Sequence, residues 1–203
     1  MARPSGHAAP RSAGRADGPA DRRRAGRSGE SGRRVITLRE LTPEDADALQ
    51  GIYSPESTRF LGRGPMSDTE ARRVAGEAVA AGTRSPHTVY TLGLDLDHDL
   101  IGIIRLHLDR PVTALSYILR ADTWGMGYPT DAVRRMLALG FGSLGLPEIQ
   151  AKHHPGNPAS GRVLLKTGFV STGEYAGFST YAIRQSVPRV PTGSVPGHPP
   201  GTE

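Results

Sequence analysis

The chain contains no cysteine. Disulfide bonds, thiolate metal ligands and a cysteine nucleophile are therefore excluded. Aromatic residues are also scarce, at 5% of the sequence, and no apolar run approaches the length of a membrane-spanning helix. No hydrophobic segment follows the N-terminal arginines, as a secretory signal would require. We therefore expect a cytoplasmic protein that does not insert into membranes.

Apolar side chains are missing from both ends of the chain. Residues 1–34 hold nine Arg, six Gly and three Pro, but no Val, Ile, Leu, Phe, Tyr or Trp. Such a segment cannot bury enough apolar surface to offset its ordering entropy, so we expect it to be disordered. Residues 186–203 are rich in Pro and Gly and are expected to form a second disordered tail. The sequence thus predicts one folded domain at residues 35–185.

The positive charge of the chain is concentrated in its first segment. Nine basic and three acidic residues give residues 1–34 a net charge of +6. The remaining 16 basic and 17 acidic residues give a net charge of −1, so the expected domain is nearly neutral. Because phosphate backbones are bound by clustered cations, this balance argues against a nucleic-acid partner for the domain.

Between the tails, alternating and helical apolar patterns follow one another. They predict an α+β fold with a mixed, mostly antiparallel sheet flanked by helices, in the order βααβββαβαββ. The expected strands are 35–39, 88–94, 100–108, 114–120, 148–152, 169–174 and 179–184. The expected helices occupy 42–52, a segment opening at 67, the segment after Gly127, and 157–167.

Two clusters of possible metal ligands are better explained without a metal. Asp95, Asp97 and Asp99 form a DxDxD run, but a calcium loop would continue with Gly and end in Glu, whereas Leu and Ile follow here. We therefore predict a hairpin turn. His153 and His154 are adjacent, so in a strand they point to opposite faces and make a poor metal pair. No metal site is expected.

The run WGMGYPTDAVRRML, residues 124–137, places two glycines and a proline directly before a helical pattern. Glycines let a backbone curl its amides inward, and a helix start carries unpaired N–H groups and a partial positive charge. The run is therefore either a plain turn before a helix or an anion site suited to phosphate.

Three stretches favour the second interpretation, because together they resemble a known family. They are LSYILRADTWGMGYPTDAVRRML, the run NPASGRVLLKTGF from Asn157 to Phe169, and the opening RELTPEDADAL with TRFLG. In this order and at these distances they resemble the GNAT N-acetyltransferases, most closely the branch that acetylates ribosomal-protein N termini. The resemblance implies the acyl-CoA N-acyltransferase fold, with acetyl-CoA as co-substrate and an amine as acceptor.

The resemblance also implies a cofactor site. In this family, amides of the loop and first helical turn hold the pyrophosphate of coenzyme A, and a bulged strand leaves one amide free to polarise the thioester carbonyl. Pro129 departs from the family pattern and has no N–H, so Thr130 is the expected substitute donor. The implied cofactor-binding residues are Ile118 or Leu119 on the strand, Trp124, Gly125, Met126, Gly127, Tyr128, Thr130, Asn157 and Ser160.

The catalytic groups depart further from the family pattern. Many relatives carry Tyr at position 164 as the acid for the departing thiolate, and Glu at position 114 as the base; this chain has Leu164 and Ala114. Ser160 matches a serine of the ribosomal branch and is the candidate acid. His107 and Glu174 remain as candidate bases.

The lack of a recognisable strong base in the sequence bears on which class of amine is the substrate. An α-amine has a pKa near ~8, whereas a lysine amine near ~10.4 is much harder to deprotonate at neutral pH. The sequence therefore favours a protein N terminus, with a small amine or antibiotic as the alternative. Substrate contacts are expected from Arg59, Phe60 and Tyr175. A non-catalytic acyl-CoA-binding module is a second alternative, given the departures at 114, 129 and 164.

Overall fold

The computed structural model describes residues 34–82, 86–109 and 111–185. The tails expected to be disordered lie outside these residues, except for Arg34. Seven strands lie close to their predicted positions: β1 (Thr37–Glu40), β2 (Val89–Leu96), β3 (Asp99–His107), β4 (Ala114–Leu119), β5 (Glu148–His153), β6 (Val170–Tyr175) and β7 (Phe178–Arg184). They form one sheet in the order β1-β2-β3-β4-β5-β7-β6.

The helices begin where capping residues predict them. The main ones are α1 (Ala46–Ile52), α3 (Asp68–Gly82), α4 (Tyr128–Ala138) and α5 (Pro158–Lys166), with a 3-10 turn at Pro43–Asp45 before α1 and a π turn at Leu139–Ser143 after α4. Asn157 caps α5, because its side-chain oxygen accepts a hydrogen bond from the backbone N–H of Ser160. Within the described ranges, no helix is long and apolar enough to cross a membrane.

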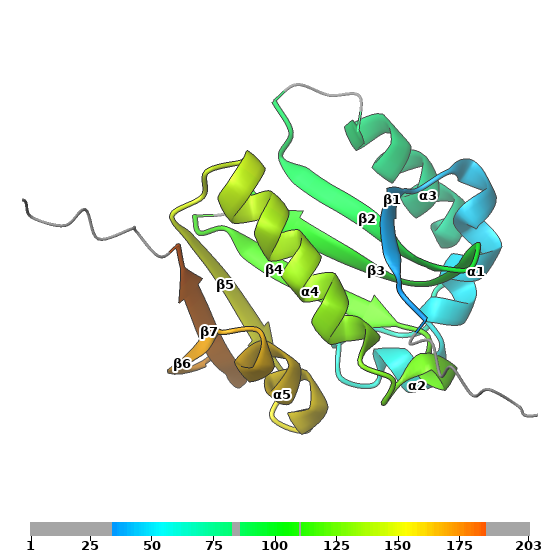
Figure 1. Ribbon diagram of the computed structural model, residues 1–203. Coiled ribbons are helices and arrows are strands. Elements are labelled where there is room, and N and C mark those ends of the chain that lie inside the picture. Colours follow the sequence, from blue (N-terminus) through cyan, green and yellow to red (C-terminus); the bar gives the residue numbers. More distant parts are fainter. Residues whose placement is uncertain (1–33, 83–85, 110, 186–203) are drawn as a thin grey trace, which may run out of the picture. The chain divides into compact units, whose positions relative to one another are not determined.

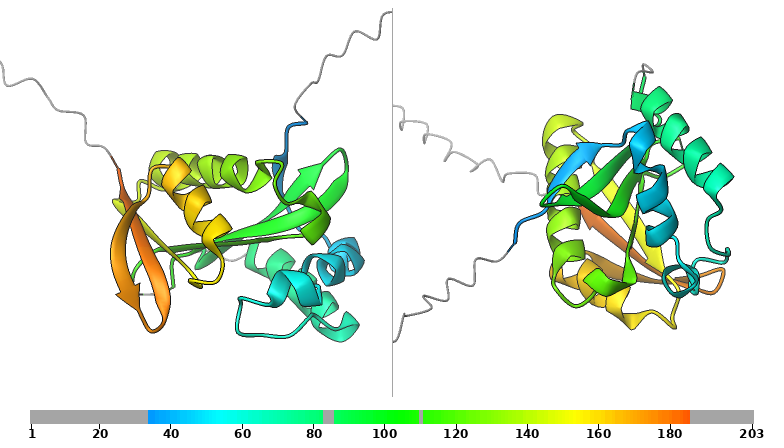
Figure 2. Two further views of the ribbon diagram at one scale, coloured as in Figure 1. Left: turned by 90° about the horizontal axis from the view of Figure 1, so that it is seen from below. Right: turned by 90° about the vertical axis from the view of Figure 1, so that its right-hand side faces the viewer.

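Helices cover both faces of the sheet and create two apolar layers. Figures 1 and 2 show α4 on one face and α1 with α3 on the other. The layer beneath α4 includes Leu106, Leu115 and Met136, and the layer beneath α1 and α3 includes Leu49 and Ile103. All five side chains are buried, so both faces of the sheet are filled by helix packing. This is the α+β architecture that the sequence predicts.

The DxDxD run forms the β2–β3 turn, as predicted. Asp97 and His98 are its two central residues, and both have positive φ angles, as a two-residue hairpin requires. The three carboxylates diverge: Asp95 binds Arg39, Asp97 lies near Arg34, and Asp99 binds Arg120.

The described part of the chain contains no group of three side chains that could hold a metal ion. His153 contacts the Tyr181 hydroxyl, whereas His154 stacks on the Phe60 ring, so the two histidines diverge as expected.

The two central strands β4 and β5 separate along their length. They are parallel, and their pairing is limited to Ala114 with Gln150 and Leu115 with Ala151. Beyond that point the strands diverge, as Figure 1 shows, and the first turns of α4 and α5 follow the diverging ends. The sheet therefore splits between its two central strands, and we call this separation of the β4 and β5 backbones the opening. The predicted cofactor residues lie on β4 or in the segments that follow β4 and β5.

Candidate active site

The edge of β4 that faces the opening carries unpaired backbone amides. Arg120 N donates to Ile101 O on the β3 side, and Thr113 O accepts from Gln150 N on the β5 side. Backbone groups of successive strand residues point to opposite edges, so the amides of Tyr117 and Leu119 point toward β5. The β4–β5 pairing ends at Leu115, so among the described residues these two amides have no strand partner.

This geometry changes the expected origin of the free amide. The resemblance implied a bulged strand, but the β3–β4 register runs without a shift from Gly102–Leu119 to His107–Ala114. The free amides arise instead because β5 diverges from β4. Of the two candidates named from the sequence, Leu119 directs its amide into the opening, whereas Ile118 directs its amide toward β3.

The glycine-rich loop that follows β4 leaves a row of backbone amides without an acceptor among the described residues. Gly125 and Gly127 have φ angles of 79° and 86°, left-handed values that favour glycine. The amides of Trp124 and Thr130 already donate to Ala121 O and Gly127 O. Hydrogen bonds within the described residues leave the amides of positions 125–128 without an acceptor. These four N–H groups at the start of α4 form an amide cradle, which suits an anion.

Beside the cradle lies a short helix that sequence analysis missed. This helix, α2 (Pro55–Thr58), is capped by Ser54, whose hydroxyl accepts from Ser57 N; the Ser-Pro pair was its signal. The two residues after it contact the segments that follow β4 and β5, because Arg59 lies near Trp124 and Phe60 stacks on His154. The Arg59 guanidinium lies 4.6 Å from the Phe60 ring centroid and 5.8 Å from that of Trp124.

Across the opening, β4 and α5 are joined by two hydroxyl groups. The Tyr117 hydroxyl lies 2.8 Å from Ser160 Oγ and 3.3 Å from the Ser160 carbonyl oxygen. Burial raises the pKa of Tyr117 to about 12, although its hydrogen bond to Ser160 acts in the opposite direction. Tyr117 therefore stays protonated at neutral pH. Sequence analysis identified Ser160 but missed Tyr117, which lies on the same strand face as Leu115 and Leu119.

On the α1 face of the sheet, next to the opening, lies a cavity of about 220 Å³. Its floor comes from β3 and β4, and its walls from the α1–α2 region. Two guanidinium groups line it, and both contact one tyrosine: Arg105 Nη1 donates to the Tyr53 hydroxyl at 2.8 Å, and Arg63 lies 4.8 Å from the Tyr53 ring centroid. The lining residues are Tyr53, Leu61, Arg63, Ile103, Arg105, Ser116, Tyr117 and Ile118.

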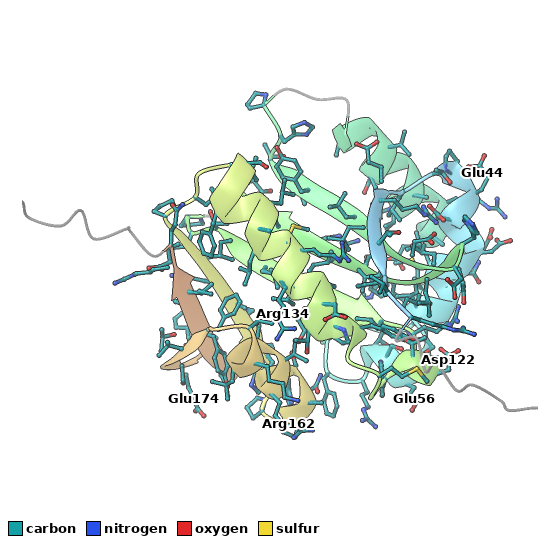
Figure 3. The ribbon with its side chains drawn as sticks, in the orientation of Figure 1. Glu44, Glu56, Asp122, Arg134, Arg162 and Glu174 are labelled. Carbon is teal, nitrogen blue, oxygen red and sulfur yellow. The ribbon has the colours of Figure 1, made fainter. Side chains whose placement is uncertain are left out.

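The two base candidates lie in different places. His107 Nε2 is 3.2 Å from Ser116 Oγ, and Ser116 lines the cavity, so His107 is one hydroxyl away from it. Glu174 lies on the exposed outer strand β6 and points away from the sheet (Figure 3). Tyr175, on the same strand, is 75% exposed. Neither residue of β6 lines the cavity.

Comparison with known proteins shows which family the chain belongs to. The family model "Acetyltransferase (GNAT) domain" matches residues 35–170. An uncharacterised N-acetyltransferase (p20) of Bacillus licheniformis is 27% identical over 143 residues, which cover 68% of this chain and 80% of the relative.

Solved structures share the fold at lower identity. Spermidine N-acetyltransferase of Vibrio cholerae, in complex with coenzyme A and spermine, has a TM-score of 0.62 and 17% identity, covering 74% of this chain and 95% of its own. RimL, a ribosomal-protein α-N-acetyltransferase in complex with coenzyme A, has a TM-score of 0.62 and 16% identity. The match covers 73% of this chain and 93% of the RimL chain. Together with the family match, the diverging strands and the amide cradle identify the chain as a member of the GNAT family of acetyltransferases.

Proposed function

We propose that this protein transfers the acetyl group of acetyl-CoA to the α-amine of a protein N terminus. The observation that carries the proposal is the opening between β4 and β5, with unpaired strand amides along one edge and the amide cradle at its mouth. An extended, anionic thioester fits this combination. The similar folds that were solved with coenzyme A support the same cofactor.

The parts of acetyl-CoA have different partners in this proposal. The pyrophosphate binds the amides of residues 125–128, where Pro129 removes the next donor and Thr130 N is already used within the helix. The pantetheine arm enters between the strands, near Asn157 and Ser160. The thioester carbonyl accepts from the amide of Leu119 or Tyr117, which stabilises the oxyanion of the tetrahedral intermediate.

The reaction is a direct transfer within a ternary complex. The neutral amine nitrogen attacks the carbonyl carbon, the carbon–sulfur bond breaks, and the amine loses a proton. The departing thiolate takes a proton from Ser160, whose hydroxyl is hydrogen-bonded to the protonated Tyr117. The proton that the amine loses passes to His107 and returns through solvent to the serine, so the hydroxyl pair is restored for the next cycle. No enzyme nucleophile is needed, which agrees with the lack of cysteine.

The cavity on the α1 face receives the amine in this proposal. Its lining residues include no carboxylate. A polyamine or aminoglycoside carries several positive charges, and the Arg105 guanidinium, which no carboxylate of the described residues neutralises, repels them. The cavity therefore favours a protein α-amine over these cationic small amines. Arg59 and Phe60 adjoin the cofactor loop and remain candidate contacts, whereas Tyr175 is less favoured because of its exposure.

The proposal is tested by incubating the protein with acetyl-CoA and a panel of N-terminal peptides, spermidine, an aminoglycoside and lysine-containing peptides blocked at the N terminus. Thiol release gives the rate, and mass spectrometry locates the acetyl group. We expect N-terminal peptides to be acetylated fastest. Acetyl-CoA binding without thiol release on any amine would instead indicate a non-catalytic module, and faster transfer to spermidine or the aminoglycoside would favour a small-amine enzyme.

His107 is the base in this proposal, because the Ser116 hydroxyl connects it to the cavity. The kcat/KM profile of the wild type should then have a limb near pH ~6–7, where histidine titrates. His107→Gln is expected to remove that limb and lower kcat/KM at pH 7 by about tenfold or more. Glu174→Gln is the matched control and should leave the profile unchanged. If the limb persists in His107→Gln, it belongs to another group and His107 is not the base. Water would then accept the proton of the amine.

A further inference from the structure

Arg105 is a half-buried cation for which the described residues supply no carboxylate partner. Its described contact is the neutral Tyr53 hydroxyl, and the ion pairs of residues 34–82, 86–109 and 111–185 do not include it. Arg39 and Arg120 are also half-buried, with 33% and 29% of their side-chain surface exposed. Each of those two binds two carboxylates: Asp45 and Asp95 for Arg39, and Asp99 and Asp122 for Arg120.

A partly buried charge is costly unless it is compensated. The described residues supply no such compensation for Arg105. Its Nη1 atom is occupied by Tyr53, whereas the edge formed by Nε and Nη2 has no acceptor among the described residues. This edge is the planar fork that binds a carboxylate through two parallel hydrogen bonds.

A second cation acts on the same cavity. Arg63 contacts the Tyr53 ring and donates to Glu70 at 2.8 Å, so its charge is already compensated. Counting Glu70, the groups around the cavity keep a net charge of +1, located on Arg105. This field attracts an anionic group, and it also lowers the pKa of a nearby ammonium and so favours the neutral amine that attacks.

We propose that Arg105 recognises an acidic side chain in the first residues of the peptide whose N terminus is acetylated. This inference depends on the proposed function and specifies its substrate class. The α-amine reaches the thioester from the cavity on the α1 face, and a Glu or Asp carboxylate next to it binds the Nε–Nη2 edge of Arg105. Neutral and basic N termini lack this contact.

The experiment compares peptides that begin Ser-Glu-Ala, Ser-Gln-Ala and Ser-Lys-Ala and are otherwise identical. Two readouts are used: kcat/KM from thiol release, and calorimetric Kd in the presence of coenzyme A. We expect the Glu peptide to exceed the Gln peptide by at least about tenfold in both, with the Lys peptide weakest. Arg105→Gln should bring the Glu/Gln ratio to within about twofold of one.

Matched variants separate this contact from net charge and from folding. Arg184→Gln removes the same charge from the exposed end of β7, and it should keep the full ratio. Arg105→Lys retains the charge without the fork and should give an intermediate ratio.

Equal binding of the Glu and Gln peptides to the wild type would overturn the inference, as would a ratio that survives in Arg105→Gln. The inference would also be overturned if the protein preferred free glutamate to free glutamine but bound the Glu and Gln peptides equally. Binding that prefers Glu without any thiol release would support the acidic contact while sinking the proposed transfer reaction.

Discussion

Gly127→Glu is expected to abolish acetyl-CoA binding. Position 127 lies in the centre of the amide cradle, directly before α4, and has a φ angle of 86°. A carboxylate at this place opposes the pyrophosphate; two unit charges about 4 Å apart at an effective dielectric constant near 20 repel by about 4 kcal/mol. That corresponds to a loss of close to 1,000-fold in affinity. The thermal shift caused by acetyl-CoA should therefore disappear, and calorimetry should show no saturation at millimolar cofactor.

Gly127→Gln is the matched control, because glutamine has the same shape and the same backbone strain without the charge. The strain costs about 1 kcal/mol in either variant. Both should therefore show the same small drop in the melting temperature of the free protein. We expect the Gln variant to bind acetyl-CoA, although more weakly than the wild type. Equal affinity of the two variants would show that the pyrophosphate binds elsewhere.

The elements of the fold were predictable because their signals are local. Thr42-Pro43-Glu44-Asp45 predicts a helix start, and the structure has a capping box there. Asn157 and Pro158 likewise predict the start of α5. The short helix α2 carries the same kind of signal in Ser54 and Pro55, but its apolar pattern is too short to be recognised alone.

The geometry of the opening was less predictable, because it depends on contacts between distant parts of the chain. A strand sequence does not reveal where its neighbour diverges, so the free amides were attributed to a bulge that the β3–β4 register does not contain. Tyr117 was missed for the same reason. It alternates with Leu115 and Leu119 as a core residue does, and its partner Ser160 lies 43 residues away.

The contact between Arg105 and Tyr53 could not be predicted from the sequence either. They are 52 residues apart, and nothing near either one marks the pair. An arginine on a strand is ordinarily solvated or paired with a carboxylate, so Arg105 stands out only once the structure shows that no carboxylate of the described residues pairs with it. Asp95, Asp97 and Asp99 are the opposite case. They look like a cluster of metal ligands in the sequence, but in the structure each carboxylate pairs with a different arginine.

Ser160→Ala is expected to lower kcat about 100-fold, the usual contribution of a general acid, with little change in the Kd of acetyl-CoA. Tyr117→Phe keeps the packed ring and removes only the hydroxyl that lies 2.8 Å from Ser160 Oγ. If the two hydroxyls act as one proton donor, this variant should also lose kcat. The double variant should then be no slower than Ser160→Ala, because residues that act as a unit are not additive.

The pH dependence distinguishes this pair from His107. Burial raises the pKa of Tyr117 to about 12, so its hydroxyl keeps its proton throughout the range in which the enzyme is assayed. Tyr117→Phe and Ser160→Ala should therefore lower the kcat profile uniformly between pH 6 and 9 without moving its limbs. An alanine variant that kept full kcat and weakened only acetyl-CoA binding would make Ser160 a pantetheine contact. The proton for the thiolate would then come from water, and the Tyr117–Ser160 hydrogen bond would only hold α5 against β4.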